Sequence, residues 1–214
     1  MPILQLLPFI LLLLFSGCRE QPASPEIADV PEDSETEQRE LWQRPGVVVS
    51  AMGDLEEKVV ADIGAGRGFL VPYVAPYADR MIAIEIDPSL VDYLRDTLRP
   101  AILPESQQPR LEVRLTQPHD SGLKENEVDV AVIVNTLLYI EGQEAYLANL
   151  NSKIKDGGRL VIVDWKGRET PYGPDLKQRI PRQKLETMLK NTGYTIKRSD
   201  EATLAYQYLI VADK

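Results

Sequence analysis

A glycine-rich segment between a buried strand and a helix sets the strongest limit on the fold. Residues 59–63 are apolar except for Asp62, and they lead directly into Gly64-Ala65-Gly66-Arg67-Gly68. Glycines allow backbone angles that other residues avoid, and they let the backbone approach a ligand closely. A strand, glycine loop and helix in this order are typical of the carboxyl edge of an open parallel sheet, where nucleotides bind. The segment therefore predicts an α/β protein with a ligand site at this loop.

The chain after Trp42 alternates short β-branched runs with longer amphipathic stretches. This pattern is typical of a Rossmann-like, doubly wound parallel sheet that is covered by helices. The last two strand-like runs are too close in sequence for a crossover helix, so they predict an antiparallel hairpin after five parallel strands. We expect strands at 58–63, 81–86, 111–115, 128–134, 159–164, 194–198 and 204–211, and helices at 68–77, 88–98, 143–153 and 181–192.

The spacing of the glycines distinguishes between several kinds of nucleotide-binding loop. A dinucleotide fingerprint requires a third glycine where this chain has Phe69, and a P-loop requires a lysine that is missing here. The third glycine instead comes one residue early, at Gly68. Together with Asp62 the segment reads D-x-G-x-G-x-G, which resembles the signature of class I S-adenosylmethionine-dependent methyltransferases.

The resemblance covers residues 42–214 and implies the seven-stranded class I methyltransferase fold, with S-adenosyl-L-methionine as cofactor. It implies that the carboxylate of Glu85, at the end of the second strand, accepts the ribose hydroxyls. Asp87 is expected to cap the helix that begins at Pro88. The expected cofactor ligands are Asp62, Gly64, Ala65, Gly66, Gly68, Glu85, Ile86, Asp120 and Asn135.

The segment after the third strand departs from the family pattern. The family commonly has an aspartate there for the adenine amino group, whereas this chain has Thr116-Gln117-Pro118-His119-Asp120. We expect Asp120 from a shifted position, or else Gln117, to take that role. The single histidine, His119, is expected at the adenine rim or on the surface; the alternative is a catalytic base, because an unperturbed histidine has a pKa of about 6.5.

Residues 127–135 resemble the family's fourth strand, whose end faces the transferred methyl group. The resemblance places Asn135, Thr136 and Tyr139 at the reaction centre, and Asn135 and Tyr139 are the expected catalytic residues. The alternative for Asn135 is that it satisfies the backbone of a turn.

The Gly- and Pro-containing segment 165–180 follows the last parallel strand, where α/β enzymes place specificity. Trp165, Tyr172 and Arg179 are the expected substrate ligands in this segment. An ordinary surface connection is the alternative.

The N-terminus resembles that of a bacterial lipoprotein. Residues 3–15 are almost wholly apolar, but they are shorter than the roughly 20 residues that span a bilayer. Phe15-Ser16-Gly17-Cys18 resembles a lipobox, which implies a signal peptide at 1–17 and a lipid on Cys18; the alternative is an uncleaved apolar tail. Residues 18–40 are acidic and contain prolines, so they predict a disordered linker. Residues 41–214 would form the methyltransferase domain.

Composition excludes several other functions. A net charge of -9 and a pI of about 4.8 disfavour a nucleic-acid partner, because phosphate binding requires clustered basic residues. One cysteine and one histidine cannot form a disulfide framework or a Cys/His zinc site, and we expect no metal.

The sequence thus predicts methyl transfer from S-adenosylmethionine to a small-molecule or membrane-associated acceptor. The lipoprotein resemblance implies a membrane anchor in the bacterial cell envelope, with the domain on the periplasmic side. That location motivates an alternative, a catalytically degenerate binding or accessory module on a membrane surface, because the cofactor is made in the cytoplasm. A nicotinamide-dependent oxidoreductase is disfavoured by Phe69. The sequence specifies neither the acceptor nor the oligomeric state.

Overall fold

The computed structural model describes residues 32–214 of the chain. The predicted signal peptide, Cys18 and the predicted linker up to residue 31 lie outside the described residues. None of the helices between residues 32 and 214 has the length and apolar character needed to cross a membrane.

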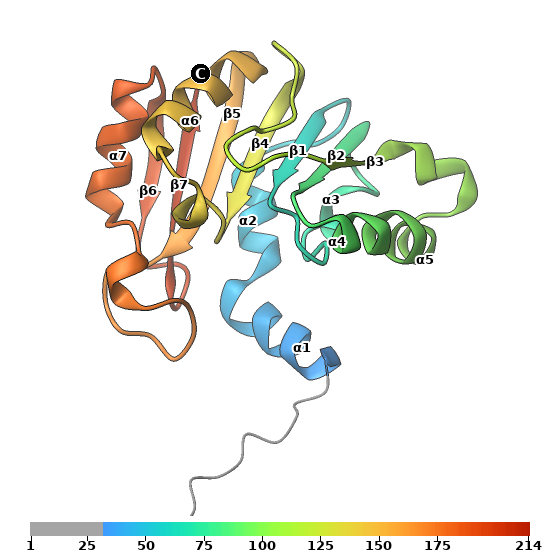
Figure 1. Ribbon diagram of the computed structural model, residues 1–214, viewed down its shortest axis with the longest axis horizontal. Helices are drawn as coiled ribbons and strands as arrows, with labels where there is room; N and C mark the ends of the chain where they lie inside the picture. The colour runs from blue at the N-terminus through green and yellow to red at the C-terminus, as the bar shows by residue number, and fades with distance from the viewer. Residues whose placement is uncertain (1–31) are drawn as a thin grey trace, which may run out of the picture.

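A seven-stranded sheet forms the centre of the described chain (Figure 1). Its order is β3-β2-β1-β4-β5-β7-β6, in which β1 to β5 run parallel and β7 lies antiparallel between β5 and β6. This confirms the predicted α/β fold of five parallel strands and a C-terminal hairpin. The strands are β1 (Val59–Ile63), β2 (Arg80–Glu85), β3 (Leu111–Leu115), β4 (Val128–Val134), β5 (Ile154–Trp165), β6 (Thr195–Asp200) and β7 (Gln207–Asp213).

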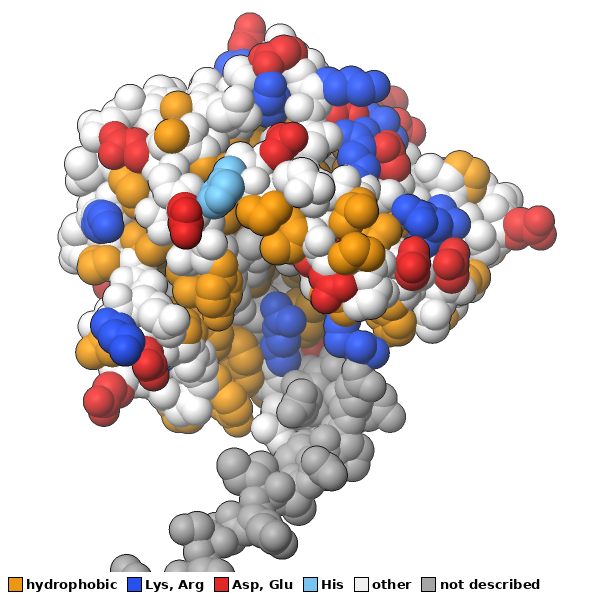
Figure 2. All heavy atoms as spheres, in the orientation of Figure 1, with side chains coloured by type: hydrophobic (Ala, Val, Ile, Leu, Met, Phe, Trp, Pro, Cys, Tyr) orange, Lys and Arg blue, Asp and Glu red, His pale blue; other side chains and the backbone are white. Residues whose placement is uncertain are grey.

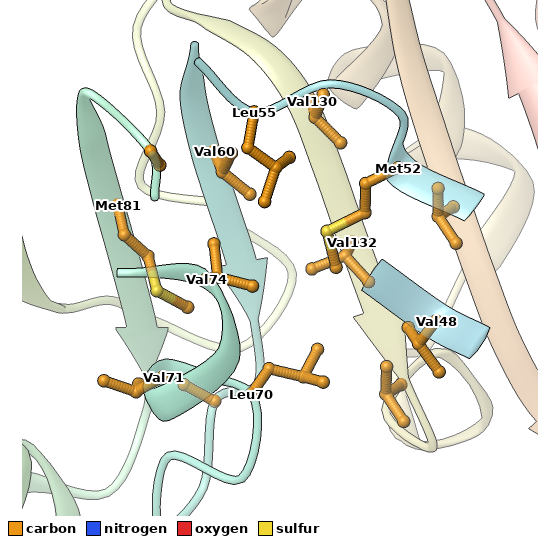
Figure 3. Close-up of a cluster of buried hydrophobic side chains, with 14 of the residues drawn as sticks. Val48, Met52, Leu55, Val60, Leu70, Val71, Val74, Met81, Val130 and Val132 are labelled. Atoms are coloured by element: carbon orange, nitrogen blue, oxygen red, sulfur yellow. The ribbon is translucent and has the colours of Figure 1, made fainter. Parts of the chain in front are cut away.

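Helices cover both faces of the sheet because alternate strand residues point to opposite sides. Val60, Val130 and Val161 belong to one core cluster, which includes residues of α2 and α3 (Figure 3). Ala61 and Leu160 belong to the second cluster, which includes residues of α6 and α7. The α-helices are α1 (Glu32–Gln43), α2 (Pro45–Met52), α3 (Val71–Val74), α4 (Pro88–Tyr93), α5 (Arg99–Ile102), α6 (Gln143–Lys153) and α7 (Arg182–Asn191).

Several boundaries differ from those predicted. Helix α3 covers only the middle of the predicted helix at 68–77, because Gly68 has a φ of 79° and cannot continue a right-handed helix. The predicted helix at 88–98 continues to Ile102 through a π-helical turn, Leu94–Leu98. Pro100 lies just after that turn and is tolerated in the first turn of α5.

Strand β5 begins at Ile154, five residues before the predicted start at 159, and includes Gly157 and Gly158. The β4–β5 register shifts between Val128 and Val130 at this point. A Cβ at Gly158 would lie 2.7 Å from the Asp129 carbonyl oxygen, so the two strands approach closely only because this residue is glycine. The last strand, β7, begins at Gln207, three residues later than predicted.

Two N-terminal helices were not predicted. Helix α1 begins at Glu32, whereas the predicted linker extends to residue 40. Helix α2 buries Val48 and Met52 against the sheet, although its three consecutive valines favour a strand by propensity. In Figure 1, α1 lies beyond the carboxyl ends of β1 and β4, on the side where the glycine loop was expected to bind its ligand.

Candidate functional site

A cavity of about 320 Å³ opens at the carboxyl ends of β1, β2 and β4. Seven of the predicted site residues line it, together with Gln117, the alternative adenine ligand. The seven are Gly64, Glu85, Ile86, Asp120, Asn135, Thr136 and Tyr139. The elements that bring them together are neighbouring parallel strands, whose carboxyl ends meet at one edge of the sheet.

Glu85 is held rigidly at the tip of β2. Its carboxylate accepts hydrogen bonds from the Gly66 amide at 2.8 Å, from the Ile86 amide at 2.8 Å and from the Asp87 amide at 3.1 Å. The side chain is only 7% exposed. These three hydrogen bonds fix the position of the carboxylate in the cavity wall.

The glycine loop has its predicted place after β1, and two of its glycines are required for different reasons. A Cβ at Gly64 would collide with the Thr136 side chain, so this glycine lets the loop pack against the end of β4. A Cβ at Gly68 would collide with Leu94 and Leu98, so this glycine lets the loop pack against the helix after β2.

Asp62 lies beneath the loop and outside the cavity lining. It is 3% exposed, and this burial raises the pKa of its carboxyl to about 7, with the nearby Glu85 adding to the rise and Arg39 opposing it. Ala65, Gly66 and Gly68 also lie outside the cavity lining, as expected if the loop faces a different part of the ligand than the cavity does.

The segment after β3 forms the opposite wall of the cavity, with Gln117, His119 and Asp120. The Asp120 carboxylate accepts a hydrogen bond from the Gly122 amide at 2.9 Å. Tyr146 of α6 also lines the cavity, and its buried hydroxyl has no hydrogen-bond partner among the described residues. An unpartnered buried hydroxyl in a cavity wall is suited to a ligand's polar atom.

Asn135 stands at the end of β4, between the cavity and α1. Its φ of 57° lies in the left-handed region, where Asn is tolerated better than most residues. Its amide oxygen accepts from Gln207 Nε2 at 2.5 Å, and its Nδ2 donates to Gln43 Oε1 at 3.4 Å. Tyr139 lines the same end of the cavity and is 67% exposed.

Gln43, Asn135 and Gln207 form what we call the carboxamide cluster. Gln43 and Gln207 are fully buried, yet Gln43 Nε2 and Gln207 Oε1 have no partner among the described residues. Leaving a buried polar atom unpaired costs about 1–3 kcal/mol, so such atoms are normally satisfied by a ligand or by water. The cluster offers one free donor and one free acceptor beside the cavity.

Trp42 of α1 packs in an aromatic cluster with Trp165, Tyr172 and Tyr206. The ring of Trp42 lies 5.3 Å from that of Trp165 and stacks on Tyr172 at 5.4 Å, measured between centroids. Figure 2 shows the molecule from the same side as Figure 1. Hydrophobic side chains line a hollow near the centre of that face, and basic side chains lie beside it.

The predicted substrate ligands in segment 165–180 lie outside the cavity lining. Trp165 is 6% exposed beneath Trp42, and Tyr172 contacts α1, where its hydroxyl donates to Gln38 at 3.2 Å. Arg179 donates to the carbonyl oxygens of Pro174, Lys166, Arg168 and Tyr172. These contacts hold the shape of the segment itself, and a direct role of the three residues toward substrate stays a prediction.

Residues of α1 are the main functional candidates that were not predicted. Arg39 approaches the glycine loop, although it was assigned to the linker, and Gln43 approaches the end of β4, although it was given no role in the site. One sequence feature could have pointed to α1. The segment Arg39-Glu40-Leu41-Trp42-Gln43-Arg44-Pro45 resembles a segment found in a subgroup of small methyltransferases. Gln207 and Tyr146 gave no such signal, because a polar residue in a strand or helix has no distinctive pattern.

The site fits S-adenosylmethionine by its own geometry. A fixed carboxylate stands at the tip of β2, a glycine loop follows β1, and an unpartnered Tyr146 hydroxyl faces the cavity. The residues suited to hold the cofactor are Asp62, the glycine loop, Glu85 and the wall at 116–120. Among residues 32–214 there is no group of three or more His, Cys, Asp and Glu that could hold a metal ion.

Comparisons with known proteins agree with this assignment. Residues 61–162 match the model of a methyltransferase domain. A solved S-adenosylmethionine-dependent methyltransferase from Aquifex aeolicus superimposes with a TM-score of 0.73 at 23% identity, over 84% of this chain and 97% of that one. Another from Mesorhizobium loti has a TM-score of 0.66 at 12% identity, over 79% of this chain and 96% of that one.

A curated relative is similar over a shorter stretch. The ribosomal RNA small subunit methyltransferase A of Koribacter versatilis (strain Ellin345) is 44% identical over 48 residues. This segment is 22% of the present chain and spans only 17% of the length of that relative. The family model matches residues 61–162, and the solved structures share the class I methyltransferase fold; together they support a methyltransferase whose cofactor is S-adenosylmethionine.

Proposed function

We propose that this methyltransferase domain transfers the methyl group of S-adenosylmethionine to a small neutral acceptor, either free or presented at a membrane surface. The observation that carries the proposal is the fixed carboxylate of Glu85 beside the glycine loop. Three backbone amides hold it at the cavity wall, where it can accept both ribose hydroxyls of an adenosine ligand.

The remaining site residues have distinct roles in this proposal. Bound S-adenosylmethionine supplies an activated methyl group on a positively charged sulfur, so the protein mainly has to align the acceptor and exclude water. Asp62, at the base of the glycine loop, faces the ammonium group of the methionine portion. Asn135 and Tyr139 orient the acceptor atom at the end of β4. Tyr146 and Asp120 contact adenine.

The chemistry around Asn135 supports a neutral acceptor. The carboxamide cluster presents one free donor and one free acceptor, and amides carry no charge at ordinary pH. The aromatic cluster lies on the same side of the sheet edge, through Trp42 of α1, and would favour a flat or apolar remainder of the molecule.

A nucleic-acid acceptor is disfavoured by charge. The chain has 33 acidic and 24 basic residues, whereas nucleic-acid affinity depends on clustered lysine and arginine. The named activity of the partial relative concerns ribosomal RNA, and the match to it covers less than a quarter of this chain.

The experiment that tests the proposal follows a labelled methyl group. The full chain is incubated with methyl-labelled S-adenosylmethionine and, separately, with a small-molecule extract, lipid vesicles made from a bacterial lipid extract, and total RNA. We expect label in the small-molecule or lipid fraction, and none with Glu85→Ala. Label that appears only in RNA would contradict the proposed acceptor class.

The second candidate is a binding or accessory module without catalysis. It is favoured by the absence of the family's usual aspartate directly after β3, in the segment 116–120. In that case the chain binds S-adenosylhomocysteine, but it transfers no label to any of the three fractions.

We also propose that Cys18 carries a lipid that anchors the domain to a membrane of the bacterial cell envelope, with the domain on the periplasmic side. The support is the apolar run at residues 3–15 and the small residues before the cysteine. Mass measurement of the mature N-terminus, with Cys18→Ser as control, tests this. An unmodified, uncleaved N-terminus in the expressed protein would contradict it.

A further inference from the structure

Arg39 of α1 stands over the end of the glycine loop. Its guanidinium carbon lies 4.1 Å from the centroid of the Phe69 ring, and Phe69 directly follows Gly68. Its Nε donates to Gln43 Oε1 at 2.8 Å, which fixes the direction of the side chain. A cation held over an aromatic face and oriented by a hydrogen bond is a positioned group rather than a solvated one.

The guanidinium of Arg39 is partly removed from water and lies close enough to Asp62 to interact with its charge. The side chain of Arg39 is half-buried, whereas Asp62 is buried. A partly desolvated guanidinium favours a nearby anion, which the carboxylate of a ligand can supply.

The methionine portion of the cofactor carries both an ammonium and a carboxylate. The buried acids beside the loop, Asp62 and Glu85, are suited to cations and hydroxyls and would repel the carboxylate. Other basic groups nearby are engaged elsewhere. Lys166 donates to the Leu204 and Ala205 carbonyls, and the guanidinium of Arg67 stacks on Tyr93.

We infer that Arg39 binds the carboxylate of the cofactor's methionine portion, so that helix α1 completes the cofactor site. The inference rests on the proposed function, because it takes S-adenosylmethionine as the ligand. Arginine suits this role because its planar fork can donate two parallel hydrogen bonds to one carboxylate.

Contacts of α1 on both sides of the site agree with this position. On the side of the glycine loop, Glu40 accepts a hydrogen bond from the Tyr73 hydroxyl at 2.5 Å. On the other side, Trp42 packs on Trp165 and Gln43 bonds to Asn135. The helix therefore crosses the site between the loop after β1 and the end of β5, whereas the cavity extends from Glu85 to the segment at 116–120.

The test uses three ligands that differ only in the methionine portion, titrated calorimetrically into the full chain. S-adenosylhomocysteine has the amine and the carboxylate, its decarboxylated analogue keeps only the amine, and methylthioadenosine lacks both. For Arg39→Gln we expect the affinity for S-adenosylhomocysteine to fall about 10- to 100-fold, the range typical of a charged hydrogen-bonded pair. The affinities for the other two ligands should be unchanged.

Arg44→Gln is the matched control, because it removes an exposed guanidinium that bonds to the Thr203 carbonyl outside the site. It should leave all three affinities unchanged. Unchanged methylthioadenosine binding also shows that Arg39→Gln is folded.

Equal losses for all three ligands would overturn the inference, because they would indicate a purely structural role for Arg39. Unchanged binding of S-adenosylhomocysteine would overturn it as well. Failure of the unmodified chain to bind any of the three ligands would overturn the proposed function itself and this inference with it, so the two failures are distinguishable.

Discussion

The Gly66 amide donates a 2.8 Å hydrogen bond to the carboxylate of Glu85, which joins the loop after β1 to the tip of β2. The same carboxylate accepts from the amides of Ile86 and Asp87, so the loop and the strand end have one shared anchor. A ligand that binds Glu85 therefore contacts a group whose position is already set by the fold. This arrangement reduces the ordering cost of binding.

Glu85→Gln should weaken S-adenosylhomocysteine binding by about 10- to 100-fold, because a charged acceptor for two hydroxyls becomes a neutral amide. Calorimetric titration measures this. Asp87→Asn is the control, since Asp87 caps α4 through Ser89 and Asn caps helices equally well. Comparable losses in both variants would contradict the assigned role of Glu85.

Binding of S-adenosylhomocysteine should depend on pH through Asp62. Its pKa is raised to about 7 by burial, and only the ionised carboxylate can pair with the ligand's ammonium. Affinity should therefore fall about tenfold as the pH is lowered from about 8 to about 6, because the ionised fraction falls by that factor. Titrations of Asp62→Asn should show weaker binding with a flat profile over this range. A slope that persists in Asp62→Asn would assign the effect to another group.

Asp164 should make stability depend on pH in a similar window. Its side chain is fully buried on β5, and this burial raises its pKa to about 7, above the value of about 3.9 in an unfolded chain. The folded state therefore retains a proton that the unfolded chain loses, so the stabilisation is complete below about pH 4 and is lost as the pH rises through 7.

Urea denaturation at several pH values measures this effect. The free energy of unfolding of the unmodified chain, minus that of Asp164→Asn, should fall by on the order of 3 kcal/mol between about pH 4 and pH 8. The subtraction removes the contributions of all other carboxyl groups. A difference that stays constant with pH would show that Asp164 is ionised throughout.

Gly68→Ala should destabilise the fold by about 2–4 kcal/mol, because it combines left-handed backbone strain with overpacking. The new Cβ would collide with Leu94 and Leu98, and the φ of Gly68 is 79°. Gly142→Ala separates the two causes, since Gly142 has a φ of 65° but no atom within 4 Å of the position that a Cβ would take. The control should lose only about 1–2 kcal/mol in thermal or urea denaturation. Equal losses would mean that packing at Gly68 contributes nothing.

Both tryptophans of the chain lie in the aromatic cluster, with ring centroids 5.3 Å apart. Trp42 is half-buried on α1, whereas Trp165 is already buried. If α1 tightens over the cofactor, S-adenosylhomocysteine should shift the tryptophan emission to shorter wavelength. Trp42→Phe should abolish the shift and Trp165→Phe should retain it. The opposite pattern would place the change in β5 instead of α1.

Much of the fold could be predicted from local pattern. The strands at 111–115 and 128–134 and the helix at 143–153 have the predicted bounds. The strand at 128–134 is a buried run of mostly β-branched residues, which is a strong local signal. Helix α2 was missed because its valines have strand propensity, and only packing of Val48 and Met52 on the sheet decides in favour of helix. The continuation of β5 through Gly158 depends on its neighbour β4, which no local pattern reports.

The site, like the fold, contains residues that local pattern could predict and residues that it could not. Gly64, Glu85 and Asn135 could be located because each follows a recognisable strand, and parallel strand ends must meet at one edge. Arg39 and Gln207 reach the site from the two ends of the chain, through a helix outside the alternating pattern and through an antiparallel strand. These contacts join residues that are far apart in the sequence, and no local pattern reports them. The acidic composition before residue 40 therefore predicted a linker there.

The contacts of α1 with Tyr73, Asn135 and Trp165 also have a kinetic consequence. If the methionine portion lies beneath this helix, spent cofactor can leave only after those contacts have opened. The rate of helix lifting then sets an upper limit on turnover, whatever the speed of the chemical step. Because α1 is also the first described element of the chain, whatever restrains the preceding segment acts directly on the part of the enzyme that times product release.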